Sequence, residues 1–208
     1  MQAKSPLALV VPTGEKRAVP AGWRANAVYR KREHLTETEI EKLIEAAKTN
    51  RYGSRDATMI LVAYRHGLRA SELCELTWDA IDFRTATIHI SRKKNGQSTT
   101  HQISGPELRE LRKLQREQNP KSAFVFVTER GTPFDRHGFN WMVKRTGKKA
   151  NLPFQCHAHM LRHAAGYTLA NAGKDTRSIQ AYLGHKDIRY TVRYTELSPN
   201  RFKNFFPD

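Results

Sequence analysis

The spacing of apolar residues after Leu35 predicts two consecutive helices at the start of the folded chain. Thr36 suits the N-cap of the first helix, and Glu39, three residues later, completes a capping box. A second helix is expected to begin near Ser54 and to end at Gly67, because glycine commonly terminates helices. The apolar positions of the first helix recur at helical spacing: Ile40, Leu43, Ile44 and Ala47.

The middle of the chain changes to the alternation typical of strands. Residues 86–90 (ATIHI) and 98–103 (STTHQI) alternate and are rich in strand-forming residues. Turn residues at 93–96 (KKNG) separate them, so this region predicts a β-hairpin. Residues 123–128 (AFVFVT) predict a third strand.

Helical spacing marks most of the remaining chain. We therefore expect a mainly α fold with a small three-stranded antiparallel β-sheet at one edge. The predicted helices span about 106–118, 136–149, 157–172, 176–183 and 187–195.

Residues 1–34 differ from the rest, because they contain three prolines and two glycines and show no helical or strand period. Seven lysines and arginines against two glutamates give this segment a net charge of +5. We interpret it as a flexible basic arm that precedes one folded domain at 35–208. A solubilising tail and a DNA-contacting arm are both consistent with this composition. The arm residues that we expect to contact DNA are Arg24, Arg30, Lys31 and Arg32.

Composition limits the class of protein and of partner. The 208 residues, 38% hydrophobic and 27% charged, suit a globular domain rather than a disordered chain. A net charge of +16 and a sequence pI of about 10.1 predict a polyanionic partner, with nucleic acid ahead of an anionic membrane surface. No apolar run reaches the roughly 18–20 residues of a membrane span. Cys74 and Cys156 form no disulfide framework, so we expect a cytoplasmic protein.

Basic side chains stand at the ends of several predicted elements, where they can meet a phosphate. Arg69 precedes a helix that Ser71 is expected to cap, and Lys94 lies at the tip of the hairpin. His159 and Arg162 are three residues apart on one helix face. Cations at loop tips and helix starts, with a tyrosine nearby, suit chemistry on a phosphodiester. Further candidates follow towards the C-terminus: His185, Tyr190 and Tyr194.

Three stretches of the chain resemble the motifs of the tyrosine recombinase (phage integrase) family. They are HGLRASEL (66–73), HMLRHAAGYTLANAGKDTRSIQAYLGH (159–185) and IRYTVRYTEL (188–197), in the order and at the spacings of that family. The resemblance covers about residues 35–205 and implies the fold of a tyrosine recombinase catalytic domain. The short length and the segment RKKNGQSTTH (92–101) are most similar to the fimbrial phase-variation DNA invertases. That subgroup lacks a separate N-terminal core-binding domain.

The resemblance implies a role for each candidate side chain. Two arginines bind the phosphate, a histidine precedes the second of them, a hairpin lysine acts as general acid, a further histidine adds a hydrogen bond, and a tyrosine is the nucleophile. We also expect Arg92 and Lys93 to contact DNA. In this implied catalytic set Arg69 and Arg162 are the arginines, and His159 is the histidine that precedes Arg162. Lys94 is the hairpin lysine, His185 the further histidine and Tyr194 the nucleophile.

These residue types suit the chemistry. Arg69 and Arg162 can each bind two oxygens of a transition state that spreads negative charge over its equatorial oxygens. His159 can accept the proton of Tyr194, and Lys94 can protonate the departing 5′-oxygen. The resemblance implies a 3′-phosphotyrosyl intermediate that a second DNA strand reseals. No ATP, metal or cofactor is required in this scheme.

Several assignments have alternatives. Tyr190 is the rival nucleophile, whereas Tyr167 and Tyr182 have the spacing of core residues. Lys93 exchanges with Lys94 if the hairpin slips by one residue. A zinc site is disfavoured by the absence of a suitably placed glutamate and by the arginine beside its candidate ligands. Those candidate ligands are His157, His159 and His163.

The expected partner is double-stranded DNA with inverted-repeat target sites in a bacterial nucleoid. The resemblance implies a tetramer in the synaptic complex, and DNA-bending accessory proteins are consistent with it. The C-terminal tail, 195–208, places three phenylalanines at 202, 205 and 206 on one short helical stripe, which can dock on its own subunit or on a neighbour. A relaxing type IB topoisomerase and a DNA-binding regulator without turnover are the alternative functions.

Overall fold

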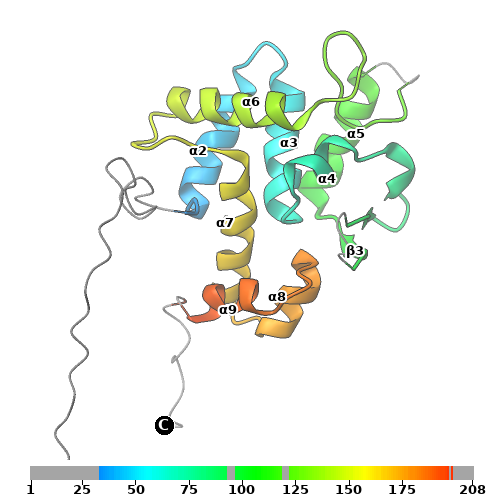
Figure 1. Cartoon of the computed structure of the whole chain (residues 1–208). Helices are drawn as coiled ribbons and strands as arrows, with labels where there is room; N and C mark the ends of the chain where they lie inside the picture. Colours follow the sequence, from blue (N-terminus) through cyan, green and yellow to red (C-terminus); the bar gives the residue numbers. More distant parts are fainter. Residues whose placement is uncertain (1–32, 93–96, 119–121, 197, 199–208) are drawn as a thin grey trace, which may run out of the picture. The chain divides into compact units, whose positions relative to one another are not determined.

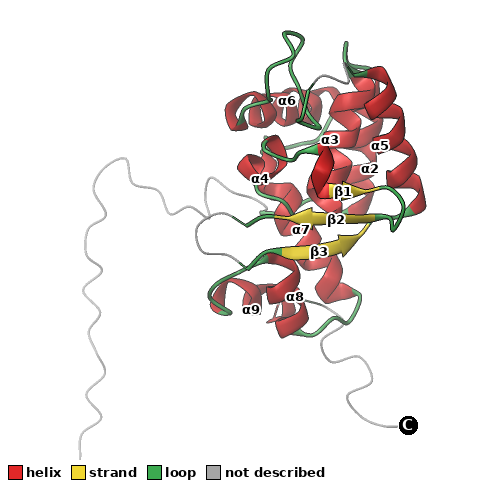
Figure 2. Cartoon of the chain, turned by 90° about the vertical axis from the view of Figure 1, so that its right-hand side faces the viewer, coloured by secondary structure: helices red, strands yellow, loops and turns green. Residues whose placement is uncertain are grey.

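The computed structural model describes residues 33–92, 97–118, 122–196 and 198. This part is mainly helical with a small antiparallel sheet at one edge, which confirms the fold class predicted from the sequence (Figures 1 and 2). No helix in it is long and apolar enough to cross a membrane. The helices are α2 (Glu37–Lys48), α3 (Gly53–Arg65), α4 (Ala70–Cys74), α5 (Gly105–Glu117), α6 (Arg136–Lys149), α7 (Ala158–Asn171), α8 (Thr176–Leu183) and α9 (Arg189–Glu196).

Local sequence signals mark the start of α2 and the end of α3 as expected. The Thr36 hydroxyl accepts a hydrogen bond from the backbone N–H of Glu39 at 3.4 Å, and the Glu39 carboxylate accepts one from the Thr36 N–H at 2.9 Å. This capping box satisfies two backbone donors at the start of α2. Helix α3 ends at Arg65, and Gly67 follows it with φ of 57°, a left-handed conformation that favours glycine.

The sheet consists of three short strands in the order β1 (Ile81–Asp82), β2 (Thr87–Ile90) and β3 (Thr99–Gln102). The predicted hairpin is confirmed, because β2 pairs antiparallel with β3 with Ile88 opposite His101. Figure 2 shows the sheet between α4 on one side and the α8–α9 pair on the other. The hairpin tip at 93–96 lies outside the described residues.

The predicted third strand at 123–128 is wrong, and β1 takes its place in the sheet. Residues 123–128 form only isolated bridges, from Phe124 to Thr77 and from Val127 to Pro133. The segment is nevertheless buried at its centre, where Val125 and Phe126 are fully covered. A short buried apolar run has the same sequence pattern whether it pairs as a strand or fills the core as a loop, so the pattern alone misassigned it.

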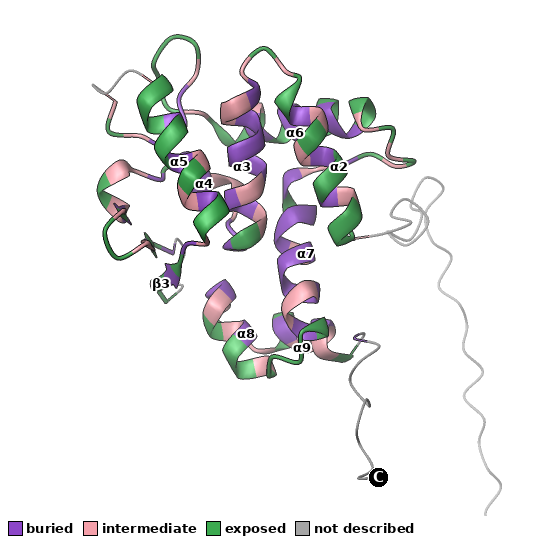
Figure 3. Cartoon of the chain, turned by 180° about the vertical axis from the view of Figure 1, so that it is seen from behind, coloured by how far each residue is buried: buried purple, intermediate pink, exposed green. Residues whose placement is uncertain are grey.

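Helix α7 connects the two buried clusters of the described domain. It contacts α2, α3 and α6 of the larger cluster and also α8 and α9. Figure 1 shows α7 running from the larger group of helices to the α8–α9 pair, and Figure 3 shows it buried over most of its length. Its burial on several sides holds the side chains of this helix in fixed positions. The smaller cluster joins α7, α8 and α9 through Ala165, Tyr167, Ala170, Ile179, Leu183 and Tyr194.

Removal of the capping box should weaken α2 measurably. Thr36→Ala is expected to lower the free energy of unfolding by about 1 kcal/mol, because the Glu39 N–H loses its acceptor. Urea unfolding measures this change. Thr38→Ala on the exposed face of the same helix is the matched control and should cause no loss, since alanine favours a helix interior. An equal loss in both variants would contradict a capping effect.

Candidate active site

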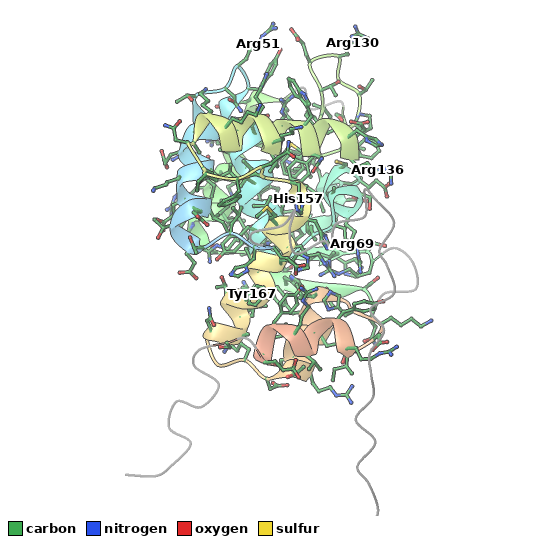
Figure 4. All side chains as sticks on the ribbon, turned by 60° about the vertical axis from the view of Figure 1, so that its left-hand side comes forward. Arg51, Arg69, Arg130, Arg136, His157 and Tyr167 are labelled. Atoms are coloured by element: carbon green, nitrogen blue, oxygen red, sulfur yellow. The ribbon has the colours of Figure 1, made fainter. Side chains whose placement is uncertain are left out.

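Arg69 lies at the start of α4, where the backbone and side chain both contact one acid. It occupies the N-cap position that we had expected Ser71 to hold, which corrects that prediction by two residues. The Glu72 carboxylate accepts a hydrogen bond from the Arg69 N–H at 2.9 Å and another from its guanidinium at 2.5 Å. The Arg69 side chain remains 34% exposed, so its other nitrogens can reach a ligand from solvent. Figure 4 shows Arg69 close to the α8–α9 end of the domain, and Arg51 and Arg130 at the opposite end.

Three guanidinium groups from different elements surround the Glu72 carboxylate. Besides Arg69, Arg92 donates to it at 2.7 Å, and the nearest nitrogen of Arg162 lies at 3.8 Å. The Glu72 side chain is only 1% exposed. Burial by itself raises the pKa of Glu72, but the Arg69 N–H and the charges of Arg92 and Arg162 outweigh it and hold this pKa below its usual range. Glu72 is therefore the counter-ion that lets these cations share one buried region.

Arg162 lies on α7 and is fixed by two backbone carbonyls. Its guanidinium donates to the carbonyl of Gly67 at 2.5 Å and to that of Leu183, the last residue of α8, at 2.7 Å. Burial and the charges of Arg69 and Arg92 lower the pKa of Arg162 to about 9, so this group stays cationic at neutral pH. Through these two hydrogen bonds Arg162 connects α7 to the segment after α3 and to the end of α8.

Tyr194 lies on α9 in a closely fitting site on α7. Its hydroxyl is 2.9 Å from Nδ1 of His163, and its ring meets that of Tyr167 edge-on at 5.0 Å between centroids. A Cβ atom on Gly166 would come within 2.7 Å of the Tyr194 ring, so only glycine leaves room there. Burial raises the pKa of Tyr194, while the charges of Arg162 and Arg193 oppose this rise. Its rival Tyr190 instead points into solvent and is 66% exposed.

His185 follows the end of α8 and faces the same region. Its Nδ1 is 2.8 Å from the hydroxyl of Thr191, and its ring is stacked 6.3 Å from that of Tyr194. Burial, followed by the charges of Arg162 and Arg69, lowers the pKa of His185 to about 3. The imidazole is therefore neutral at physiological pH, a form that can still donate one hydrogen bond.

His159 does not contact the Tyr194 hydroxyl. It lies exposed on α7, with its ring edge-on to that of His163 at 4.4 Å between centroids. Desolvation by the surrounding residues and the charges of His163 and Arg162 lower the pKa of His159 to about 4. The sequence motif identified this residue as the proton acceptor, whereas the geometry brings His163 to the tyrosine.

Arg92 is placed differently from the expected DNA contact. Its side chain is fully buried and donates to Glu72 at 2.7 Å and to the carbonyl of Tyr182 at 2.6 Å. It therefore supports Glu72 from inside the protein. The remaining predicted DNA contacts, the general acid and most of the tail lie outside the described residues: Arg24, Arg30, Lys31, Arg32, Lys93, Lys94 and 199–208.

A buried polar network fixes the hairpin beside this site. His66 contacts the Glu107 carboxylate at 2.8 Å through Nε2 and Nδ1 of His101 at 3.2 Å through its other nitrogen. The ring of Tyr182 stacks on His101 at 3.8 Å. These residues come from the end of α3 and from α5, β3 and α8, so the network ties the base of the hairpin to α8, whose carbonyls bind Arg92 and Arg162.

Sequence reasoning missed Glu72, His163 and this network as parts of the site. Glu72 is three residues after Arg69, a helical spacing that signals an ion pair. His163 follows Arg162 directly, and the i, i+4 spacing from His159 suggested only metal binding. The pairing of His66 with His101 and Glu107 has no local signal, because 35 and 41 residues separate the partners.

Together the described side chains can bind and attack a phosphate group. Arg69 and Arg162 supply fixed positive charge, His185 supplies a neutral donor, and Tyr194 supplies a nucleophilic oxygen beside an imidazole. Such an arrangement suits transfer of a phosphoryl group to a phenol.

Comparisons with known proteins agree with this geometry. The model of the phage integrase family matches residues 33–201. The type 1 fimbriae regulatory protein FimB of Escherichia coli K12 is 42% identical over 177 residues, which cover 83% of this chain and 88% of FimB. FimE of the same strain is 41% identical, with 83% and 89% covered. The crystal structure of XerA recombinase superposes with a TM-score of 0.73 at 26% identity, covering 84% of this chain and 65% of XerA.

Loss of the Glu72 charge should destabilise the domain strongly. Glu72→Gln is expected to cost about 3–5 kcal/mol of unfolding free energy at pH 7, because buried guanidinium groups lose their counter-ion. Since the pKa of Glu72 is depressed on folding, its ionised form stabilises the protein above the unfolded pKa of about 4.3. This contribution disappears as the pH falls through the lower folded pKa.

Urea unfolding at several pH values measures the difference between Glu72→Gln and the parent protein. The difference should be full at pH 7 and shrink below about pH 4. Glu41→Gln, at an exposed position of α2, is the matched control and should be near neutral. A cost that stays constant across this pH range would contradict the counter-ion role.

Proposed function

Because the chain belongs to the phage integrase family and is a tyrosine-type site-specific recombinase, we propose that it breaks and rejoins double-stranded DNA through the phenolic oxygen of Tyr194. The observation that carries this proposal is the position of the Tyr194 ring. It lies 6.3 Å from the His185 ring between centroids, and its hydroxyl contacts His163, which is next to Arg162 on α7. The candidate nucleophile on α9 and the Arg162 cation on α7 thus come from two helices in contact, and Arg69 joins them from the start of α4.

The scissile phosphate is bound by fixed charges before it reacts. Arg69 faces solvent in part and meets the phosphate first, while Arg162 and Glu72 hold the positive cluster in place. His185 adds a neutral hydrogen bond to a non-bridging oxygen. These preorganised donors stabilise the negative charge that the transition state spreads over the equatorial oxygens.

Attack by the Tyr194 oxygen forms a bond to phosphorus and breaks the bond to the 5′-oxygen. Lys94 protonates that leaving oxygen as general acid, a role that its hairpin position suits. The phosphotyrosyl ester retains roughly the energy of the original phosphodiester, so a free 5′-hydroxyl of another strand can attack it and reseal the DNA. The scheme consumes no ATP and uses no metal or cofactor.

The charge of the chain supports DNA as the partner, and the fimbrial relatives support one outcome of the recombination reaction. A net charge of +16 provides affinity for phosphates without sequence information, to which the basic segment 1–34 contributes +5. The resemblance of the motifs to the fimbrial phase-variation invertases, together with the similarity to the type 1 fimbriae regulatory proteins FimB and FimE, supports inversion between inverted-repeat sites, with integration as the alternative outcome. We infer that subunits assemble on two sites as a tetramer, in which the C-terminal tail docks on a neighbour. A type IB topoisomerase would instead relax DNA at single sites.

The nucleophile can be identified by trapping. Tyr194→Phe should bind target DNA as the parent does and form no covalent adduct with a nicked suicide duplex, as judged on a denaturing gel. Tyr190→Phe is the matched control and should form the adduct normally, because its side chain points into solvent. An adduct that survives Tyr194→Phe and disappears in Tyr190→Phe would reverse the assignment. An adduct that forms in both variants would mean that neither of these tyrosines of α9 is the nucleophile.

The general acid can be identified by changing the leaving group. Lys94→Ala should slow cleavage by about 10²–10⁴-fold, because the 5′-oxygen departs without a proton. A bridging 5′-phosphorothiolate leaves without protonation and should restore the rate. Lys93→Ala is the control for register and should need no rescue. Arg162→Ala should not be rescued, since its role is at non-bridging oxygens. Rescue of Lys93→Ala instead of Lys94→Ala would assign the role of general acid to Lys93.

A further inference from the structure

The Tyr194 hydroxyl lies against an imidazole to which neither the motif match nor the chemistry above gives a role. Nδ1 of His163 is 2.9 Å from the phenolic oxygen, within hydrogen-bond distance. The two rings meet edge-on with centroids 5.9 Å apart. Gly166 and Tyr167 confine the tyrosine ring on its other sides, so the contact is held by packing and not by a flexible side chain alone.

From this geometry we propose that His163 is a further catalytic residue, which orients the Tyr194 hydroxyl and accepts its proton during attack on phosphorus. The inference deepens the proposed function and rests on Tyr194 as the nucleophile. It transfers the role of proton acceptor from His159, to which the sequence pointed, to the next histidine along the same helix face.

The proton transfer balances with the bond changes already described. Neutral His163, protonated on Nε2, presents the lone pair of Nδ1 to the Tyr194 O–H. As the oxygen bonds to phosphorus, its proton moves to Nδ1 and the imidazolium forms. The P–O5′ bond breaks and the leaving oxygen takes a proton from Lys94. In the resealing step the imidazolium returns the proton to the departing phenol, so no co-reactant is needed.

The surroundings of Tyr194 explain why an acceptor is needed. Burial raises the pKa of this phenol, although Arg162 and Arg193 act in the opposite direction. A protonated phenol is a weak nucleophile, and a base within hydrogen-bond reach removes that obstacle. Histidine suits the role because its ordinary pKa lies nearest to neutral pH among side chains.

His159 is less suited to this task. It is exposed, and its ring lies edge-on to the His163 ring, with centroids 4.4 Å apart. The hydroxyl of Tyr194 is hydrogen-bonded to His163 instead. The exposed His159 imidazole instead suits a hydrogen bond to a phosphate oxygen that approaches from solvent.

The test uses the full-length protein and a suicide duplex under single-turnover conditions. His163→Asn keeps a polar amide near the position of Nδ1 but cannot take the proton, and it should slow cleavage by about 10²–10⁴-fold. Replacement of Tyr194 with 3,5-difluorotyrosine lowers the pKa of the nucleophile. In the His163→Asn background it should restore most of the lost rate, because the phenol then ionises without a base.

Two controls separate this role from packing and from the general acid. Tyr167→Phe keeps the ring that contacts Tyr194 and should cleave at the parent rate. A 5′-phosphorothiolate should not rescue His163→Asn, because the defect is on the nucleophile and not on the leaving group. His163→Gln provides a second variant if His163→Asn has a lowered melting temperature.

The outcomes decide between the possibilities. Rescue by difluorotyrosine in either His163 variant, with DNA binding and melting temperature retained, supports the proposal. Cleavage at the parent rate in both variants, or a loss that difluorotyrosine does not restore, overturns it. Both of the latter results leave the proposed function intact as long as Tyr194→Phe forms no adduct. An adduct that persists in Tyr194→Phe would overturn the function itself.

Discussion

The compensation of three guanidinium groups by the buried carboxylate of Glu72 is the interaction on which the rest of the site depends. Arg69, Arg92 and Arg162 come from separate elements, and without an anion between them their mutual repulsion would oppose folding. Glu72 offsets that repulsion and leaves a net positive cluster, because one negative charge faces three positive ones. Arg69 is the member with a solvent-facing side chain, so a phosphate can approach the cluster there and supply the second anion.

Helix α7 links the positive cluster to the nucleophile. Arg162 and His163 are adjacent on it, and Gly166 lies one turn further on, where its missing side chain admits the Tyr194 ring. The helix is packed by neighbours on several sides, so these positions cannot shift independently. In the proposed function, this one helix positions both the phosphate-binding Arg162 and the attacking Tyr194 before DNA arrives, and such preorganisation lowers a reaction barrier.

Local patterns predicted most of the fold because helices of this chain have strong start and stop signals and amphipathic spacing. The capping box at Thr36 and the five helices from α5 to α9 were found close to their observed ranges. The error at 123–128 has the opposite cause. Three consecutive apolar residues at its centre, 125–127, are buried, and such a run carries no period to distinguish a strand from a loop. Strand β1 has only two residues, too few to show alternation.

The sequence by itself determined the family to which the chain belongs and the candidate set of reactive side chains in their order, because motif spacing within a helix or turn is a local property. The tertiary structure decided which of them touch. Arg92 points inward to Glu72, and His163, in place of His159, lies against Tyr194. These contacts join residues 20 and 31 positions apart, and their distances depend on how whole helices pack. No pattern within one helix contains that information.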